Sequence, residues 1–469
     1  MPAPLPTLPT PDARVVIVGA GPTGLGAANR LHELGHTSWD LFEAIERPGG
    51  LARSFVDDAG FTWDIGGHVQ FSHYPYFDRM MDRLLGDGWL HHEREAWAWM
   101  FGRFVPYPVQ NNVRHFPTEP MLACLEGMVE AGQRRAAGAI DVRTFRDWLS
   151  ASFGEGLCEH FMYPYNFKVW AIDPAGMTPH WVGDRVASPD LGRILRNVVL
   201  EQDDVSWGPN NTFRFPERGG TGSIWEALAA SLPQDRLHYN KRVAGVDTAR
   251  RQLRFEDGSV EDYDVLLSTM PIDTLAAASD RTDLAETAAE ARFSSSHIVG
   301  IGVDGPVPDE LRTKCWMYFP EDDCPFYRVT VFSNYSPNNV ARPSEQWSLM
   351  AEVSESADKP VDAERVVEDT VRGMRATGLL GPDHDVVSRW HFRAGHGYPT
   401  PFLRRSQVVD PVREAFSELG VHSRGRFGAW KYEVSNQDHS MMQGVEFVNA
   451  LLFGTPEVTL HHPTVVNGR

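Results

Sequence analysis

The chain has 469 residues, more than one compact core accommodates, so two or three packed domains are expected. Hydrophobic residues make up 42% of it and charged residues 23%, which is ordinary for a folded globular protein and excludes extensive disorder. The net charge of −19 repels nucleic acid and anionic membrane surfaces, so neither is an expected partner. Any site for an anionic ligand must therefore be built locally from a few arginines.

Targeting features and cysteine pairs are both missing from the sequence. The first dozen residues are rich in proline and lack the basic and apolar regions of a signal peptide, and no apolar run reaches the roughly 18 residues of a membrane span. The four cysteines contain no C-x-x-C pair, which predicts neither a disulfide framework nor a zinc site: Cys124, Cys158, Cys315 and Cys324. We expect packed free thiols, a reducing cytoplasmic setting and no metal.

In chain order, the predicted elements begin with a β-α-β unit: an apolar strand at 14–18, a helix from about 23 to 34 and a strand at 38–43. Helical spacing dominates residues 122–200, and strand patterns follow at 240–270, with a turn at 256–258. Further strands are predicted at 297–303, 315–319, 327–332 and 347–353, and helices at 364–380, 407–419 and 438–452. This order suggests a nucleotide-binding domain interrupted by two insertions.

The glycine turn after the first strand, Gly19-Ala20-Gly21-Pro22-Thr23-Gly24, fits G-x-G-x-x-G. Its glycines allow a tight turn, a close approach of the backbone to a pyrophosphate, and close packing of the following helix, whose N-terminus favours phosphate. Alone the hexamer is a weak signal, because glycine turns also occur by chance. Its position between a strand and a helix strengthens it.

Two further features predict that the dinucleotide is FAD. Glu43 ends the second strand, where an acid binds a ribose hydroxyl. A second glycine turn then follows at 46–54, and its Gly49-Gly50 pair resembles the extended motif of the FAD-dependent amine oxidase and mutase superfamily rather than that of NAD dehydrogenases.

A series of distinctive segments extends over nearly the whole chain. The first is a histidine-containing loop, Gly66-Gly67-His68-Val69-Gln70-Phe71-Ser72-His73-Tyr74. The others follow at 105–112, 164–170, 208–210, 315–322, 325–328, 333–336, 396–401, 424–428, 432 and 436–440. In sequence and in order these segments closely resemble UDP-galactopyranose mutases of the eukaryotic type, in which the first is the histidine loop.

The resemblance implies an α/β fold with a Rossmann-like FAD-binding domain, an inserted helical domain and an antiparallel β-sheet domain. The implied boundaries are 1–90, 212–294 and 384–469 for the discontinuous FAD-binding domain, 114–197 for the helical substrate domain, and 91–113, 198–211 and 295–383 for the β-sheet domain. It also implies an isomerase that interconverts pyranose and furanose forms of a nucleotide sugar, UDP-galactose in the first instance. In that family the reduced flavin N5 attacks the anomeric carbon, and NADPH is the implied reductant.

The resemblance also assigns roles to residues. Arg328 and Arg426 clamp the diphosphate, whose charge grows as the glycosidic bond breaks, and Arg185 and Asn210 lie near the phosphates and sugar. His68 contacts the flavin and gates it. The remaining substrate-binding set is Tyr107, Gln110, Phe161, Tyr165, Asn166, Trp170, Trp316, Tyr318, Tyr335, Tyr398 and Tyr432. The FAD-binding set is Gly19, Gly21, Thr23, Gly24, Glu43, Gly50, Leu51, Ala52, Gly66, Gly67, His68, Val243, Asn436, Gln437 and Ser440. His73 and Arg94 match positions implicated in NADPH binding.

Two other functions stay open, the first because of a departure from the family and the second because the FAD fingerprint is shared with oxidases. Val109 stands where the family commonly has a phenylalanine beside the base, so the same ring contraction could act on a GDP-hexose or UDP-arabinose. A third hypothesis is an FAD-dependent oxidase of the amine oxidase class. That function requires an apolar or amine pocket, against which the arginine and tyrosine set argues. The oligomeric state stays open.

Overall fold

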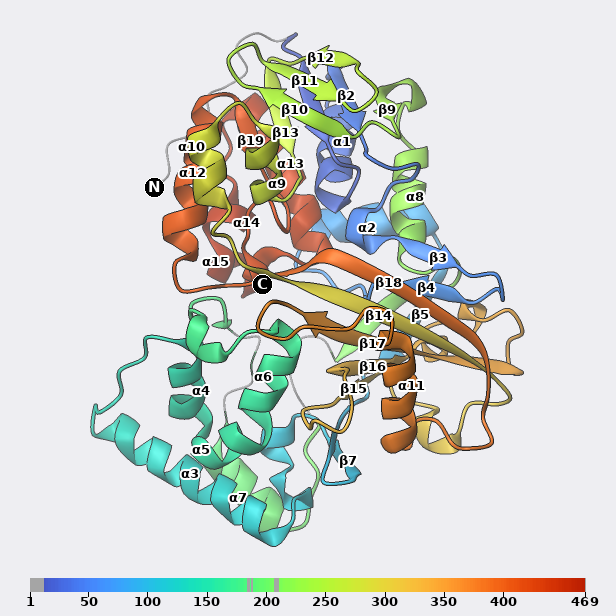
Figure 1. The fold of residues 1–469 in the computed structure, drawn as a ribbon, viewed down its shortest axis with the longest axis vertical. Coiled ribbons are helices and arrows are strands. Elements are labelled where there is room, and N and C mark those ends of the chain that lie inside the picture. Colours follow the sequence, from blue (N-terminus) through green and yellow to red (C-terminus); the bar gives the residue numbers. More distant parts are fainter. Residues whose placement is uncertain (1–11, 184–185, 187–188, 206–210, 469) are drawn as a thin grey trace.

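The structure is a computed structural model that describes residues 12–183, 186, 189–205 and 211–468 (Figure 1). A five-stranded, wholly parallel sheet carries the nucleotide-binding segments, in the order β19-β13-β1-β2-β9. Its strands are β1 (Val15–Val18), β2 (Trp39–Phe42), β9 (Leu237–His238), β13 (Val265–Ser268) and β19 (Val421–Ser423). The predicted β-α-β opening is confirmed, with α1 (Pro22–Glu33) between β1 and β2.

The central strand β1 faces two separate hydrophobic cores, because successive side chains of a strand point to opposite faces. Val15 and Ile17 pack into the core shared with α1, α2 (Pro75–Leu85), α8 (Gly222–Ala230) and α13 (Gln437–Phe453). Val16 and Val18 pack into the core on the other face. That face is covered by β10 (Val243–Asp247), β11 (Gln252–Phe255), β12 (Val260–Asp262), α9 (Ile272–Ala278), α10 (Thr282–Ala288) and α12 (Arg405–Glu418). All four β1 side chains are therefore buried, as an apolar parallel strand requires.

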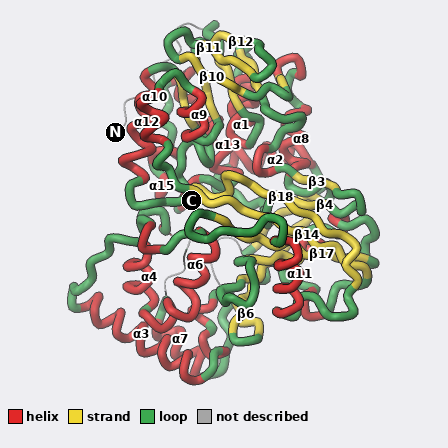
Figure 2. The backbone as a smooth tube through the Cα atoms, viewed as in Figure 1, coloured by secondary structure: helices red, strands yellow, loops and turns green. Residues whose placement is uncertain are grey.

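A larger, seven-stranded sheet lies beside this unit, with the order β18-β14-β17-β16-β15-β6-β7 (Figures 1 and 2). All its neighbours are antiparallel except β15 and β6, which run parallel. The strands are β6 (Ala96–Met100), β7 (Arg103–Pro106), β14 (Phe293–Asp304), β15 (Trp316–Tyr318), β16 (Arg328–Val331), β17 (Gln346–Glu355) and β18 (Asp385–Pro399). Helix α11 (Val366–Ala376) packs on one face of this sheet.

The strand β18 corrects one expected domain boundary. It hydrogen-bonds to β14 from end to end, so residues 385–399 belong to the seven-stranded sheet and not to the nucleotide-binding unit, where the sequence placed 384–469. The hydrophobic pattern did not predict a strand here, because β18 is an edge strand. Its polar side chains, including Arg389, His391 and Arg393, are exposed or half-buried.

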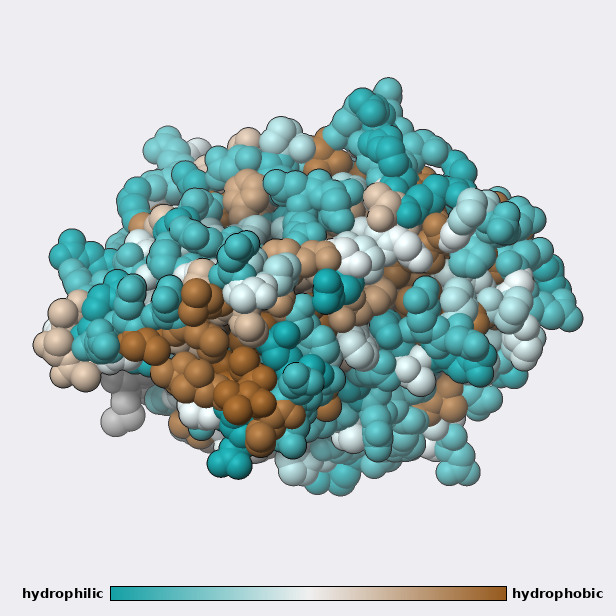
Figure 3. All heavy atoms as spheres, turned by 90° about the horizontal axis from the view of Figure 1, so that it is seen from below, coloured by the Kyte–Doolittle hydropathy of each residue, from teal (hydrophilic) through white to brown (hydrophobic). Residues whose placement is uncertain are grey.

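The helical segment confirms the spacing seen in residues 122–200. It contains α3 (Thr118–Ala136), α4 (Phe145–Phe153), α5 (Glu155–Leu157), a π-helical turn at Cys158–Met162, α6 (Tyr163–Trp170) and α7 (Leu191–Val199). Exposed apolar side chains of α3 and α7 include Leu122, Val129, Leu195 and Val199. Seen from below, where these helices lie, the surface carries a cluster of hydrophobic residues (Figure 3).

The remaining elements are short. Two antiparallel pairs join β3 (Ser54–Val56) to β4 (Thr62–Asp64) and β5 (Trp89–Glu93) to β8 (Thr212–Pro216). The helices α14 (Val458–His461) and α15 (Pro463–Asn467) end the described chain. All four cysteines are free and buried. Among the described residues, no helix is both long and apolar enough to cross a membrane.

Candidate functional site

The two predicted glycine turns lie against each other. A Cβ added to Gly50 would come within 3.2 Å of the Cα of Gly21, and one added to Gly24 would lie 1.9 Å from the carbonyl oxygen of Gly19. Gly19 has a φ of +99°, and a Cβ there would lie 2.1 Å from Thr269 Oγ1. These positions exclude any side chain, as a backbone cradle for a pyrophosphate requires. Leu51 and Ala52 continue the second turn as a short 3₁₀ helix.

Glu43 is fixed beside this cradle. Its Oε2 accepts a hydrogen bond of 2.7 Å from the N–H of Ala20, and its Oε1 accepts one of 3.2 Å from the N–H of Ile45. The backbone N–H of Lys241 donates to the Glu43 carbonyl oxygen at 2.8 Å, which brings the start of β10, at Val243, close by. The acid thus lies at the end of β2, where a ribose hydroxyl would be bound.

Helix α13 brings a second N-terminus to the same region. It packs closely on α1, because a Cβ on Gly444 would lie 2.0 Å from the carbonyl oxygen of Thr23. Asn436 is its N-cap residue and makes no side-chain capping bond, which leaves first-turn N–H groups to other acceptors. Gln437 accepts a 2.8 Å hydrogen bond from Trp225 Nε1, and the Ser440 hydroxyl donates to Ser435 O at 3.4 Å. The glycine cradle, Glu43 and these two helix termini fit FAD.

The two glycines of the histidine loop disfavour side chains for different reasons, Gly67 for lack of space and Gly66 for its positive φ. A Cβ on Gly67 would lie 2.8 Å from Thr330 Oγ1 and 3.0 Å from Trp316 Nε1, and Gly66 has a φ of +98°. Burial, together with the positive charges of Arg426 and Arg328 and against the charge of Glu352, lowers the pKa of His68 to about 4. The imidazole is therefore neutral at pH 7, and its Nδ1 is buried with no hydrogen-bond partner among the described residues.

Arg328 lies beside the loop and is held by a residue that sequence reasoning missed. Its Nε and Nη2 donate to the two carboxylate oxygens of Glu352 at 2.8 and 2.9 Å. Although burial opposes its charge, the Arg328 guanidinium and the Tyr327 hydroxyl hold the pKa of Glu352 below its usual range. A charged residue inside the apolar run of β17 was the signal that could have found it.

Arg426 is positioned by neutral groups. It donates to the carbonyl oxygens of Gly397 and Ser435, at 3.0 and 3.2 Å, and to Ser435 Oγ at 2.9 Å. Its guanidinium lies 4.9 Å from the ring centroid of Tyr398. In the described part of the chain Arg426 has no carboxylate partner, so its charge is available to an anion.

Aromatic side chains surround the two arginines. Tyr318 has its ring centroid 4.9 Å from Tyr107 and 5.4 Å from Tyr165, which stacks on Phe161 at 5.2 Å. A second group joins Trp170, Tyr398 and Tyr432, with centroids 4.7 to 5.9 Å apart. The structure therefore brings together most of the predicted substrate set.

Three buried hydrogen-bond donors lie in the same region as the two arginines. Trp316 Nε1, Thr330 Oγ1 and Tyr335 Oη are buried and complete no hydrogen bond with good geometry among the described residues. Such groups cost free energy, about 1–3 kcal/mol each, unless a partner is supplied. Thr330 was not predicted, and it lies opposite Trp316 in the β15–β16 pairing.

Two predicted positions lie outside the described residues, and at two others, Asn166 and Val109, the side chain is engaged within the protein. Arg185 and Asn210 lie outside the described residues. The Asn166 side chain donates back to the carbonyl oxygen of Met162 at 2.8 Å. Val109 is fully buried in the core of the helical segment, so it borders no open space that a larger base could use. Gln110, next to it, is buried as well.

Arg94 lines a cavity of about 80 Å³ with Tyr107, Val205 and Asn211. Its guanidinium lies 4.6 Å from the Trp316 ring and its Nη2 donates to the Tyr318 hydroxyl at 3.4 Å. Arg94 is thus next to the substrate set.

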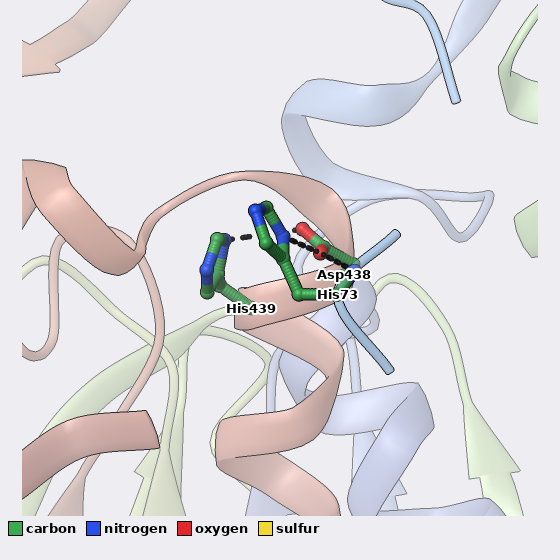
Figure 4. A group of neighbouring side chains, drawn as sticks. All are labelled: His73, Asp438 and His439. Atoms are coloured by element: carbon green, nitrogen blue, oxygen red, sulfur yellow. Dashed lines mark hydrogen bonds and ion pairs between the residues drawn. The ribbon is translucent and has the colours of Figure 1, made fainter. Parts of the chain in front are cut away.

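His73 belongs to a different cluster, with Asp438 and His439 (Figure 4). Its Nδ1 and backbone N–H both contact Asp438 Oδ2, at 2.8 and 3.2 Å, and His439 Nδ1 lies 3.1 Å from Asp438 Oδ1. These are metal-ligand types, but Asp438 already accepts from His73 and lies in the first turn of α13, where the helix dipole disfavours a cation. We interpret the cluster as a hydrogen-bonded pair of His73 and Asp438, with the His439 ring packed beside His73.

Comparison with known proteins agrees with this geometry. The sequence profile of the family described as flavin containing amine oxidoreductase matches residues 22–445. The chain therefore belongs to the flavin-containing amine oxidoreductases, within which it groups with the UDP-galactopyranose mutases. The crystal structure of a reduced UDP-galactopyranose mutase shares 47% of its residues with this chain, covers 97% of both chains and superposes with a TM-score of 0.94. The predicted fold class and family are thereby confirmed.

More distant relatives show only the fold or part of the chain. A putative protoporphyrinogen oxidase from Exiguobacterium sp. 255-15 has a TM-score of 0.70 at 17% identity and covers 94% of this chain and 98% of its own. Protoporphyrinogen oxidase 2 of Arabidopsis thaliana is 21% identical over 305 residues, which are 55% of this chain and 57% of that protein. The chain spans about half the length of the curated relatives that it matches first.

Proposed function

We propose that this protein is a flavin-dependent mutase that interconverts the pyranose and furanose forms of UDP-galactose. The observation that carries the proposal is the convergence of Arg328, Arg426 and the neutral His68 around the glycine loop. Similarity to a UDP-galactopyranose mutase along 97% of the chain supports the same reaction. When bound in its reduced form, the flavin supplies a nucleophilic nitrogen to the anomeric carbon.

In this proposal the two arginines bind and stabilise the diphosphate as it leaves the sugar. Arg426, which lacks a carboxylate partner among the described residues, supplies an unneutralised charge, while Arg328 is held in a fixed orientation by Glu352. The hydroxyls of Tyr335, Tyr398 and Tyr432 and the Trp316 indole supply neutral donors to the phosphates. No acid or base is needed from His68, whose lowered pKa leaves it neutral.

The aromatic group around Tyr318 binds the uracil and sugar. Tyr107, Phe161 and Tyr165 offer flat faces, and Gln110 offers an amide that can hydrogen-bond to a base edge. Trp170 and Asn166 complete the predicted pocket, and Arg185 and Asn210 are proposed to lie near the phosphates. A GDP-hexose is less favoured, since the buried Val109 leaves no added space for a purine. UDP-arabinose carries the same base as UDP-galactose and is distinguished only by the assay below.

We also propose that NADPH reduces the flavin, that Arg94 and His73 contribute to its binding, and that the protein works in a reducing, cytoplasmic setting. Arg94 lines the cavity beside Tyr107, which supports the first role. His73 is held by Asp438 and is only 9% exposed, which supports an indirect role better than a direct one. Four buried, unpaired cysteines are compatible with the setting.

The test is ring interconversion by the reduced holoenzyme. Dithionite-reduced protein is incubated with UDP-galactofuranose, GDP-hexoses and UDP-arabinose, and the products are separated by chromatography. We expect UDP-galactopyranose to form from UDP-galactofuranose only after reduction. Turnover of a GDP sugar without turnover of UDP-galactose would move the assignment to another nucleotide sugar. Oxygen consumption with an amine, in place of isomerisation, would assign an oxidase.

A further inference from the structure

The buried carboxylate of Glu352 joins two parts of the site that come from distant segments. Glu352 lies on β17 directly opposite Arg328 on β16, and its side chain is 3% exposed. Besides the two bonds from Arg328, it accepts a 2.6 Å hydrogen bond from Tyr327 Oη and a 3.0 Å hydrogen bond from the N–H of Gly67. One carboxylate therefore holds both the predicted diphosphate ligand and the backbone of the histidine loop.

The two glycines of the histidine loop pack against the Glu352 carboxylate. A Cβ on Gly66 would lie 3.4 Å from Glu352 Oε2, and one on Gly67 would lie 3.6 Å from Oε1. The Gly67 N–H and the Arg328 Nε share the same oxygen, Oε1. Two donors on one acceptor compete, so a change at one of them alters the strength of the other.

On the basis of the proposed function, we infer that Glu352 is a positioning residue that couples diphosphate binding at Arg328 to the histidine loop that faces the flavin. An arriving diphosphate withdraws part of the guanidinium's attraction from Glu352. The carboxylate then binds the Gly67 N–H more strongly, and the loop that carries His68 tightens. The charge of the leaving group therefore changes the position of the loop beside the flavin before the glycosidic bond breaks.

A stability role alone does not account for this arrangement. A buried ion pair contributes little net stability, because desolvation offsets its attraction, and apolar residues of similar volume are often as stable. What an apolar residue could not do is accept hydrogen bonds from Gly67 and Arg328 together.

The test compares Glu352→Gln with Tyr327→Phe. Each removes a hydrogen bond at the same carboxylate, but only Glu352→Gln removes its charge. In the ligand-free holoenzyme we expect Glu352→Gln to raise the flavin midpoint potential, because a negative charge near the flavin is lost, while Tyr327→Phe leaves it near the wild-type value. An unchanged potential in Glu352→Gln would overturn the inference.

A second measurement tests diphosphate binding at Arg328, with UDP as the probe. In wild type we expect UDP binding to change the flavin absorption spectrum. We expect Glu352→Gln to bind UDP at least as tightly as wild type, because Arg328 is no longer neutralised. The variant should nevertheless lose this spectral change, and its kcat should fall at least tenfold. Retention of that spectral change would contradict the coupling. If Glu352→Gln does not fold, Glu352→Asp keeps the charge but shortens its reach, and must lose the UDP-induced change with a near-normal potential.

Failure of the proposed function looks different. Wild-type protein that neither binds UDP nor converts UDP-galactofuranose would remove the mutase assignment. The midpoint potentials of the ligand-free variants would still decide whether the charge of Glu352 acts on the flavin.

Discussion

The FAD cradle and the arginine site are built in opposite ways. The cradle is made of backbone, and within residues 19–52 its glycines exclude side chains from a surface that needs none. The arginine site is made of side chains from the histidine loop, β15, β16, β17, β18 and the segment before α13, which lie far apart in the sequence. A local pattern can therefore specify the first region, whereas the second depends on how strands of the large sheet pair. The two regions should fail in different ways.

The largest effect is expected at Gly24. An alanine there would place its Cβ 1.9 Å from a backbone oxygen, so the turn must open and the purified protein should carry little or no flavin. The measurement is the flavin-to-protein ratio from absorption spectra, with circular dichroism to verify folding. Gly132→Ala is the matched control, because a Cβ there meets nothing within 4 Å. A Gly24→Ala protein with a full complement of bound flavin would show that the cradle tolerates side chains.

Arg328→Ala should separate the regions most cleanly. We expect flavin content to stay at the wild-type level while kcat/KM falls. The fall should correspond to a loss of about 2–4 kcal/mol of transition-state stabilisation, as when one charge-stabilising donor is removed. Steady-state kinetics of the reduced enzyme with UDP-galactofuranose give this value. Loss of flavin in parallel would mean that the regions are not separable, and unchanged kcat/KM would exclude Arg328 from the site.

A pH-dependent contribution is expected from His68. Its pKa of about 4 in the folded protein lies below the 6.5 of the unfolded chain, so between these values the unfolded state binds a proton that the native state does not. Stability is therefore lost as pH falls from 6.5 to 4, and is unaffected above 6.5. In urea unfolding, wild type should lose roughly 1–3 kcal/mol more than His68→Gln over that window. Parallel curves for the two proteins would contradict the buried neutral imidazole.

The smallest effect is expected from Tyr335→Phe. The hydroxyl completes no hydrogen bond with good geometry among the described residues, so its removal should leave stability unchanged or slightly raised, while UDP binding weakens by about 0.5–1.5 kcal/mol. Calorimetric titration of the reduced proteins with UDP measures the difference. Equal affinities would indicate a tyrosine that serves packing alone.

The sequence predicted the first region almost residue by residue. The strand, turn and helix at 14–34 and the acid at Glu43 follow from local chemistry, and the structure differs from them by one or two residues at the element ends. A parallel strand that is buried on both faces must be apolar throughout, and a turn that must approach a phosphate must be glycine. Because these constraints limit the residue type at each position, the local structure can be predicted from the sequence.

The second region could be predicted only through resemblance to a family, and then incompletely. Glu352 was missed because its role depends on the pairing of β16 with β17, which no local pattern encodes. β18 was missed because an edge strand does not need alternating apolar residues. Val109 suggested a roomier base pocket, but its side chain is fully buried in a core, a fact of tertiary packing.

The double-sided packing of β1 has a consequence for how this enzyme could change over evolutionary time. Val15 and Ile17 serve one core, Val16 and Val18 serve another, and the cofactor turn begins at the next residue, Gly19. A substitution that shifts β1 in either core therefore also shifts the start of the turn. Variation in both cores is constrained by cofactor retention, whereas the helical segment packs in a core of its own and is constrained by the substrate.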